Sequence, residues 1–319
     1  MKKCQGNFIS NGRLLQVGLI SFCNGKNLPI HIFSAKDIMR MSQFTHKELL
    51  HWDSTFKLYN GVMGNQRIYI KKFYSGFFGM EVSSREIVAA AQMGVYRNSL
   101  KLLGCCLETD FPILIYEFPE RGCLAHQIYG KTTCELHWKI RLKIAYEIAY
   151  ALAYLQNGFH TPVIHRNLSA RDVFLDENYV AKIFGFFLSV SIPEGEEHLM
   201  DAVVGTNGYS EPEYMVSGRL TKTTDVFLFG VLFLELLAKR RWLDMKLSVS
   251  KHPSEKVSHH CRDGGMDKLL DEGILEEIKG NRKQQEVVEV LQLISRCLAS
   301  KGDDRPDIVD VATALKKFW

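Results

Sequence analysis

The segment from Val226 to Ala238 places the strongest constraint on the fold, because it is apolar almost without interruption. A run of this length favours a helix over a strand. A helix that is hydrophobic on every face must be covered on every face by other elements. A chain of 319 residues, 46% of them hydrophobic, is large enough to supply that cover. The sequence therefore predicts a large helical unit built around this segment.

Other parts of the chain carry weaker helical signals. Apolar residues recur at helical spacing from Leu136 to Leu155 and again from Val287 to Trp319. A short helix is expected at Phe33–Ile38, with Ser34 as its N-cap. Between Arg240 and Gly265 the pattern gives way to Lys, Ser, His and Gly, which predicts a surface insert.

Composition excludes several classes of protein. A net charge of +4 without a basic stripe argues against a nucleic-acid partner. The eight cysteines are irregularly spaced, which favours reduced thiols in the cytosol over a disulfide framework. No stretch approaches the roughly 18 apolar residues of a membrane span. The run His259-His260-Cys261 predicts no metal site, since adjacent side chains diverge.

One motif resembles a known catalytic motif but lacks the residues that perform its chemistry. The run from His165 to Asp172 reads H-R-N-L-S-A-R-D and resembles the protein-kinase catalytic loop, H-R-D-L-x-x-x-N. In that family the Asp accepts the proton of the substrate hydroxyl and the Asn holds a magnesium ion. Here Asn167 stands at the base position and Asp172 at the metal-ligand position. Gly185 stands where the family's D-F-G motif has its magnesium-binding Asp.

Further blocks follow in the order and spacing of a kinase. Residues 68–71 resemble the V-A-I-K strand, whose Lys71 is expected to pair with Glu86 of helix αC. The remaining blocks are 101–106 and 113–118, which resemble the strands leading to the hinge, then 205–213, which resembles G-T-x-G-Y-x-A-P-E, then 225–230 and 304–306.

The resemblance implies an α+β, bilobal protein-kinase-like fold. It has a small β-rich N-lobe with helix αC and a large helical C-lobe. We expect a lead-in segment with a short helix at 1–44, the N-lobe at 45–118 and the C-lobe at 119–319.

The phosphate-binding loop is also damaged. A kinase needs glycines there so that backbone amides can approach the triphosphate. Those positions fall on His51, Asp53 and Phe56, and no glycine lies between Lys47 and Asn60. An aromatic ring and an acid at these positions would crowd and repel phosphates, so neither nucleotide nor any other cofactor is expected.

The losses predict a pseudokinase without catalytic residues or a bound metal. An amide at Asn167 cannot accept a proton at neutral pH, and a general base contributes about 10²- to 10⁴-fold. Glycine at 185 supplies no ligand. Asp172 leaves two alternatives open, since it could hold a lone cation weakly or be a hydrogen-bonded loop acid.

The retained residues can be explained by the fold. Lys71 and Glu86 form either a structural ion pair or a nucleotide contact. Asp225 is expected to accept backbone amides of the catalytic loop, and Glu213 to pair with Arg305 in the manner of the family's buried pair. Acidic candidates to bind Arg166 within the chain are Glu194, Glu196 and Glu197. Hydroxyls open to modification, or engaged in caps and turns, are Ser189, Ser191, Thr206 and Ser210.

The lead-in at 33–36 and the continuation at 189–196, after the damaged D-F-G, resemble the ZRK group of plant receptor-like cytoplasmic pseudokinases. The resemblance implies an adaptor in plant immunity. One face would bind the leucine-rich-repeat domain of a coiled-coil NLR immune receptor. Another would sense bacterial effectors or receptor-like cytoplasmic kinases that effectors have modified. We expect such a protein to be cytoplasmic, where its partners could associate it with a membrane.

The leading hypothesis is therefore a catalytically inactive cytosolic adaptor or decoy. Two alternatives stay open. One is a binding module that responds to nucleotide without turnover. The other is a weakly active, atypical kinase that uses Lys71 and Asp172.

Overall fold

The computed structural model describes residues 2–23, 30–52, 55–74, 79–130, 136–245, 253–263, 265–279 and 281–318. The chain divides into two compact units. Unit 1 comprises Met1–Glu120 together with Phe184–Ser189, and unit 2 comprises Arg121–Ile183 and Val190–Trp319. Residues 1–44, expected as a lead-in, belong to unit 1.

Unit 1 is built on a five-stranded antiparallel sheet with the order β1-β2-β3-β5-β4. Ile68 and Ile70 lie two positions apart on β3, so they share one face, where they join a buried apolar cluster. The next residue, Lys71, therefore points to the opposite face. The strands are β1 (Leu49–Trp52), β2 (Phe56–Met63), β3 (Gln66–Phe73), β4 (Leu102–Cys106) and β5 (Ile113–Glu117).

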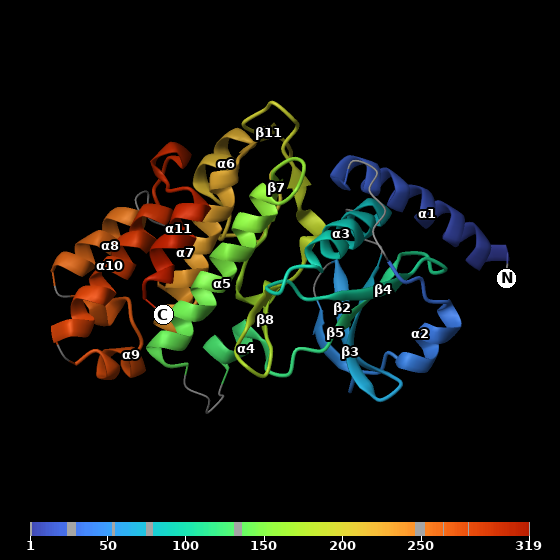
Figure 1. Cartoon of the computed structure of the whole chain (residues 1–319), viewed down its shortest axis with the longest axis horizontal. Helices are drawn as coiled ribbons and strands as arrows, with labels where there is room; N and C mark the ends of the chain where they lie inside the picture. Colours follow the sequence, from blue (N-terminus) through green and yellow to red (C-terminus); the bar gives the residue numbers. More distant parts are fainter. Residues whose placement is uncertain are drawn as a thin grey trace. The chain divides into compact units, whose positions relative to one another are not determined.

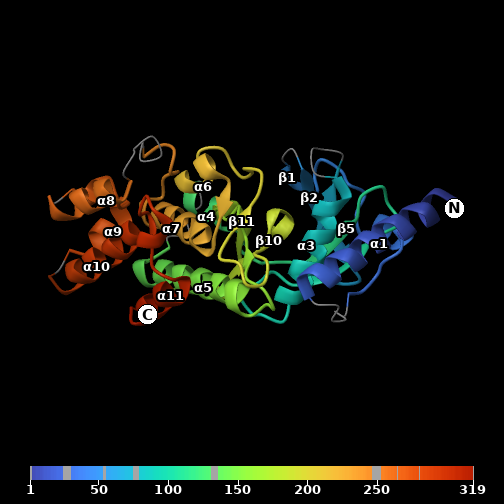
Figure 2. The same ribbon diagram turned by 90° about the horizontal axis from the view of Figure 1, so that it is seen from above.

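Helix α3 (Gly79–Met93) is buried between the sheet and a second helix, α1 (Lys2–Cys23). Its residues Ile87 to Ala90 are fully buried one after another, which requires cover on more than one face. Helix α1 supplies part of that cover and lies next to α3 in both views (Figures 1 and 2). At Gly18 of α1 a Cβ atom would lie 3.1 Å from Val88 Cγ2, so the small residue permits this close packing.

Polar contacts fix the N-terminal helices to the sheet. The Asn11 amide donates hydrogen bonds to the carbonyls of Leu107 and Thr109, each at 2.9 Å. The predicted short helix is confirmed as α2 (Ala35–Met41), and Ser34 caps it in a reciprocal capping box with Asp37.

The chain just before α2 pairs with the edge of the sheet. Cys105 N donates to His31 O at 2.9 Å, and Phe33 N donates to Cys105 O at 2.8 Å. A Cβ on Gly104 would lie 2.4 Å from His31 O, so only glycine lets this segment approach β4. The segment thereby covers the edge strand β4, whose backbone groups would otherwise be exposed.

Unit 2 surrounds the apolar segment that begins at Val226, as predicted. Every residue from Thr224 to Ala238 of α7 is buried, and α5, which was also predicted, contacts both α7 and α11 (Figure 1). The helices are α4 (Leu124–Tyr129), α5 (Trp138–Asn157), α6 (Pro212–Ser217), α7 (Lys222–Ala238), α8 (Pro253–Arg262), α9 (Glu272–Glu277), α10 (Asn281–Cys297) and α11 (Ile308–Lys316).

Short strands and 3₁₀ turns complete unit 2, and one 3₁₀ turn, η2, lies in the Phe184–Ser189 part of unit 1. The strands form three small sheets, β6-β8-β9, β7-β10 and β11-β12. They are β6 (Gly122–Cys123), β7 (Val163–Ile164), β8 (Val173–Leu175), β9 (Ala181–Ile183), β10 (Val190–Ser191), β11 (Leu199–Met200) and β12 (Arg219–Leu220). The turns are η1 (Ala170–Asp172), η2 (Phe186–Leu188), η3 (Met266–Lys268) and η4 (Gly302–Asp304).

The predicted surface insert between Arg240 and Gly265 is wrong in part. Helix α8 lies within it and packs against α10. Pro253 and Val257 are its buried residues, and Ser258 and Ser295 share a hydrogen bond of 2.7 Å. So small an apolar face leaves little periodicity in the sequence, which explains why the helix was not predicted.

The expected fold class is confirmed, with a β-sheet N-lobe that carries one long helix after its third strand and a helical C-lobe. Within the described ranges, no helix is long and apolar enough to cross a membrane.

Candidate functional site

The side chain of Lys71 lies at the centre of a buried polar group in unit 1. Its Nζ atom is 2.5 Å from Glu86 Oε2 on α3, and Tyr116 of β5 donates its hydroxyl to Glu86 Oε1 at 2.8 Å. All three residues are fully buried. Burial, aided by the Glu86 charge, raises the pKa of Tyr116 well above its ordinary value, so the phenol remains a donor. The predicted pair between Lys71 and Glu86 is therefore present in the fold.

Among the described residues, four phenylalanine rings lie around the Lys71 ammonium group. Nζ lies 3.9 Å from the ring centroid of Phe56, 5.0 Å from Phe73, 4.6 Å from Phe184 and 4.7 Å from Phe187. We call these four rings the aromatic cage. Each distance falls within the range of a cation–π interaction, which is strongest where water is absent.

The aromatic cage occupies the space in which a kinase lysine would meet phosphate. The lysine of a working kinase pairs with the α- and β-phosphates as well as with the αC glutamate. Here the ammonium is enclosed by Glu86 and the rings, and its side chain has no exposed surface. A phosphate could reach it only if a ring moved.

Gly185 makes the aromatic cage possible. Its φ of +84° lies in the left-handed region, which favours glycine over any residue with a Cβ atom. This turn lets Phe184 on one side and Phe187 on the other both reach Lys71. Glycine adopts this turn readily and offers no side chain to a magnesium ion.

The predicted phosphate-loop positions behave differently from one another. Phe56 is buried in the aromatic cage, as stated above. The His51 ring on β1 lies 5.7 Å from the Phe56 ring, centroid to centroid. Asp53 lies outside the described residues. Aromatic side chains from β1 and β2 therefore gather where a glycine-rich loop would leave room for phosphates.

Asp225 holds the catalytic-loop backbone in unit 2, as predicted. Its carboxylate accepts the His165 N–H at 2.7 Å and the Arg166 N–H at 2.9 Å. Burial raises the pKa of Asp225 to about 6, although both amide hydrogen bonds act to lower it. Arg166 has a φ of +71°, and these bonds help to hold that unfavourable conformation.

Both remaining motif positions of the loop, Asn167 and Asp172, are hydrogen-bonded within unit 2. Asn167 accepts the Thr206 hydroxyl through Oδ1 at 2.9 Å. Asp172 Oδ2 accepts the backbone N–H of Ser169 at 3.1 Å and its hydroxyl at 2.7 Å, which closes a capping box on η1. These contacts favour the reading of Asp172 as a hydrogen-bonded loop acid. Within the described residues no group of three His, Cys, Asp or Glu side chains could hold a metal ion.

Arg166 binds the activation segment, but not through the predicted glutamates. Its Nη1 donates to Asp201 Oδ2 at 2.8 Å and its Nε to the Tyr214 hydroxyl at 2.9 Å, while Nη2 donates to Ala202 O. The predicted candidates Glu194, Glu196 and Glu197 are exposed instead. Asp201 lies next to Ala202, whose carbonyl accepts a hydrogen bond from the same guanidinium. The partner of Arg166 is therefore decided by proximity in the fold and could not be identified from the motif.

The predicted pair of Glu213 with Arg305 is wrong. Arg305 Nη2 lies 2.7 Å from Glu211 Oε1, and both side chains are buried. Glu211 is the N-cap of α6 and accepts the Tyr214 N–H at 2.7 Å, so its side chain turns inward. Glu213 accepts the Gly302 N–H at 2.8 Å instead. The sequence signal that could have indicated this pairing is Glu211, a glutamate at the position where the kinase motif has alanine.

Two of the four predicted modification sites are inaccessible. Ser189 is fully buried, and the Ser191 hydroxyl is buried as well. No transferring enzyme could reach either hydroxyl in this conformation. Thr206 is exposed and donates to Asn167, and Ser210 is half-buried, so these two remain predictions.

Comparison with known proteins connects this geometry to a family. The model of the protein tyrosine and serine/threonine kinases matches residues 66–315. The chain is 33% identical over 320 residues to the non-functional pseudokinase ZED1 of Arabidopsis thaliana, which covers 97% of this chain and 95% of ZED1.

Two further proteins of Arabidopsis thaliana are similar. The non-functional pseudokinase ZRK2 is 34% identical over 322 residues, covering 98% of this chain and 89% of ZRK2. The serine/threonine-protein kinase ZRK1 is 33% identical over 330 residues, covering 98% of this chain and 92% of ZRK1. Similar proteins thus include both non-functional and kinase-named members.

Proposed function

This chain belongs to the protein tyrosine and serine/threonine kinase family, as a member of its ZRK group, and on that premise we propose that it is a catalytically inactive adaptor or decoy. It acts in the cytoplasm and links an NLR immune receptor, through the receptor's leucine-rich-repeat domain, to bacterial effectors or to kinases modified by them. Two of its relatives carry the name non-functional pseudokinase, which supports the inactive state.

The aromatic cage around Lys71 is the observation that carries the inactive state. A lysine that contributes to phosphoryl transfer must be able to contact nucleotide. Here the rings of Phe56 and Phe187 lie against the ammonium group of Lys71, and the buried carboxylate of Glu86 forms an ion pair with it. The amide of Asn167 and the glycine at 185 remove the base and the metal ligand as well. The part of the fold that remains available for function is its surface, which can bind partners.

Specific contacts oppose both alternatives. A nucleotide-responsive module requires phosphate to reach Lys71, which the aromatic cage opposes. A weakly active kinase requires Asp172 as a metal ligand, yet its carboxylate is engaged with Ser169.

Phosphate transfer and receptor association test the proposal together. We expect radiolabel transfer from ATP to stay at background in magnesium and in manganese, while the protein co-purifies with an NLR receptor from plant tissue. A metal-dependent transfer that disappears in folded Lys71→Met/Glu86→Gln protein would contradict the inactive state. Failure to recover any NLR receptor with the folded protein would contradict the adaptor role.

A further inference from the structure

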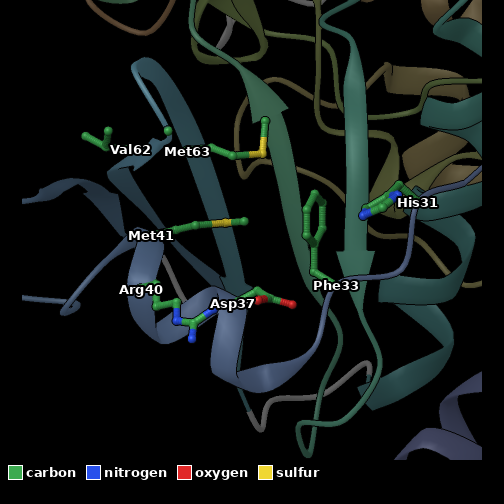
Figure 3. A pocket seen from close by; sticks show the side chains of 8 residues that line it. His31, Phe33, Asp37, Arg40, Met41, Val62 and Met63 are labelled. Atoms are coloured by element: carbon green, nitrogen blue, oxygen red, sulfur yellow. Dashed lines mark ion pairs between the residues drawn. The ribbon is translucent and has the colours of Figure 1, made fainter.

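A pocket of about 350 Å³ opens on unit 1, on the side of the sheet that carries α2 (Figure 3). Its walls come from the segment before α2, from α2 itself, and from the end of β2 with the first residue of the turn that follows it. It belongs to a part of the fold that the kinase motifs do not use. Its volume lies at the lower end of the range for ligand pockets in proteins.

The floor of the pocket is apolar and firmly supported. Phe33, Met41 and Met63 are half-buried and pack against the buried cluster that includes Ile38 and Ile70. In Figure 3 the side chains of Met41 and Met63 extend in the same direction, toward the Phe33 ring. Thioethers adapt to apolar groups of different shapes and make favourable contacts with aromatic rings.

The rim carries one available cation. The Arg40 side chain is 68% exposed, and among the described residues its ion pair is with Asp37 at 3.6 Å. Asp37 is already engaged, because its other oxygen accepts both the N–H and the hydroxyl of Ser34 in the capping box. These hydrogen bonds lower the pKa of Asp37, so it stays ionised as part of the helix cap. The guanidinium is therefore open to a second carboxylate.

We propose that this pocket binds a peptide segment of a protein partner in which an aromatic side chain stands next to an acidic one. The aromatic ring enters the pocket against Met41, Met63 and Phe33. The neighbouring carboxylate pairs with Arg40, whose planar fork suits a carboxylate. The identity of the partner rests on the proposed adaptor function, whereas the pocket and its chemistry do not.

Methyl NMR with three short peptides tests the pocket on the full-length protein. The probes are acetyl-Phe-Glu-amide, acetyl-Phe-Gln-amide, which lacks the charge, and acetyl-Ala-Glu-amide, which lacks the ring. With carbon-13 in the methionine methyls, we expect acetyl-Phe-Glu-amide to shift Met41 and Met63 in a saturable manner at millimolar concentration. Met39, exposed on the same helix but outside the pocket, and Met200 of unit 2 serve as internal controls and should not move.

Two substitutions separate the contribution of the charge from a general effect. Arg40→Gln should weaken acetyl-Phe-Glu-amide by roughly two- to fivefold, as expected for an exposed ion pair, and leave acetyl-Phe-Gln-amide unchanged. Arg13→Gln removes the same charge from α1, away from the pocket residues, and should change neither.

Three results would overturn the proposal. They are no saturable shift with any probe, equal shifts of Met39 and Met200, and an Arg40→Gln protein that binds acetyl-Phe-Glu-amide as before. None depends on phosphate transfer or on receptor recovery, so this site and the proposed function can fail separately.

Discussion

A double-mutant cycle on Lys71 and Glu86 tests whether the lysine serves the fold. In a working kinase the lysine acts on nucleotide, so its replacement mainly affects turnover. Here both side chains are fully buried, and removing one partner of a buried ion pair costs about 3–5 kcal/mol. We therefore expect Lys71→Met to lower the free energy of unfolding by that amount, because Glu86 keeps an unpaired charge.

The same contacts predict the unfolding free energies of the other two variants in the cycle. Glu86→Gln should cost less than Lys71→Met, since the four rings still stabilise the cation at about 0.5–2 kcal/mol for a desolvated contact. The double variant Lys71→Met/Glu86→Gln should recover most of the loss, because a buried pair can often be replaced by neutral groups of similar size. The coupling energy, which is the sum of the two single losses minus the loss of the double variant, should therefore be at least about 3 kcal/mol, the upper end of the range for residues in contact.

Urea denaturation followed by far-UV circular dichroism measures the four free energies, with m-values compared to check that the transitions are equivalent. Native-state hydrogen exchange of α3 amides assigns the loss to unit 1. If Lys71→Met unfolds within about 1 kcal/mol of the natural protein, or if the single effects simply add, the lysine has no structural role and the reasoning is refuted.

Three further predictions concern other parts of the fold. Glu211→Gln should destabilise unit 2 by about 3–5 kcal/mol in thermal unfolding, because it leaves buried Arg305 without its charge partner. Glu213→Gln, which removes no partner of Arg305, should cost less than about 1 kcal/mol. A larger loss for Glu213→Gln than for Glu211→Gln would support the pair of Glu213 with Arg305 that the sequence predicted. Gly104→Ala should cost at least about 1–3 kcal/mol by forcing a Cβ against His31 O, whereas Gly12→Ala, in α1 with nothing within 4 Å of the new methyl, should stabilise by about 0.5–1 kcal/mol. Burial raises the folded-state pKa of Asp225 to about 6. The folded state therefore binds a proton more readily than the unfolded chain, and the stabilisation that this gives is full below about pH 4 and is lost as the pH rises through about 6. Asp225→Asn should flatten that part of the curve of unfolding free energy against pH.

The large elements of the fold could be predicted because their signals are local. The apolar run of α7 and the spacing of α5 both reflect a buried helix, and motif order identified the strands. Helix α1 was missed because Gly6, Gly12 and Gly18 interrupt its pattern, and its stability comes from packing on α3. The wrong expectation at α8 has a similar cause, since few of its residues are buried.

The absences at the site could be predicted more readily than what replaces them. The sequence shows that Asn167 and Gly185 lack the required chemistry, and that follows from residue type alone. The aromatic cage requires Phe184 and Phe187 to reach Lys71 from a distant part of the chain, which only the turn at Gly185 brings about. The choice of Glu211 over Glu213 likewise depends on which side chain the N-cap of α6 directs inward.

Thermal unfolding with and without magnesium-ATP tests the central claim most directly. A ligand that binds only the folded state at a hundred times its Kd would add about 2.7 kcal/mol to the stability. Because the aromatic cage and Glu86 enclose the Lys71 ammonium, we predict that millimolar magnesium-ATP leaves the melting temperature of the natural protein unchanged. A saturable rise in melting temperature with magnesium-ATP would show that phosphate reaches the site, and would contradict the account.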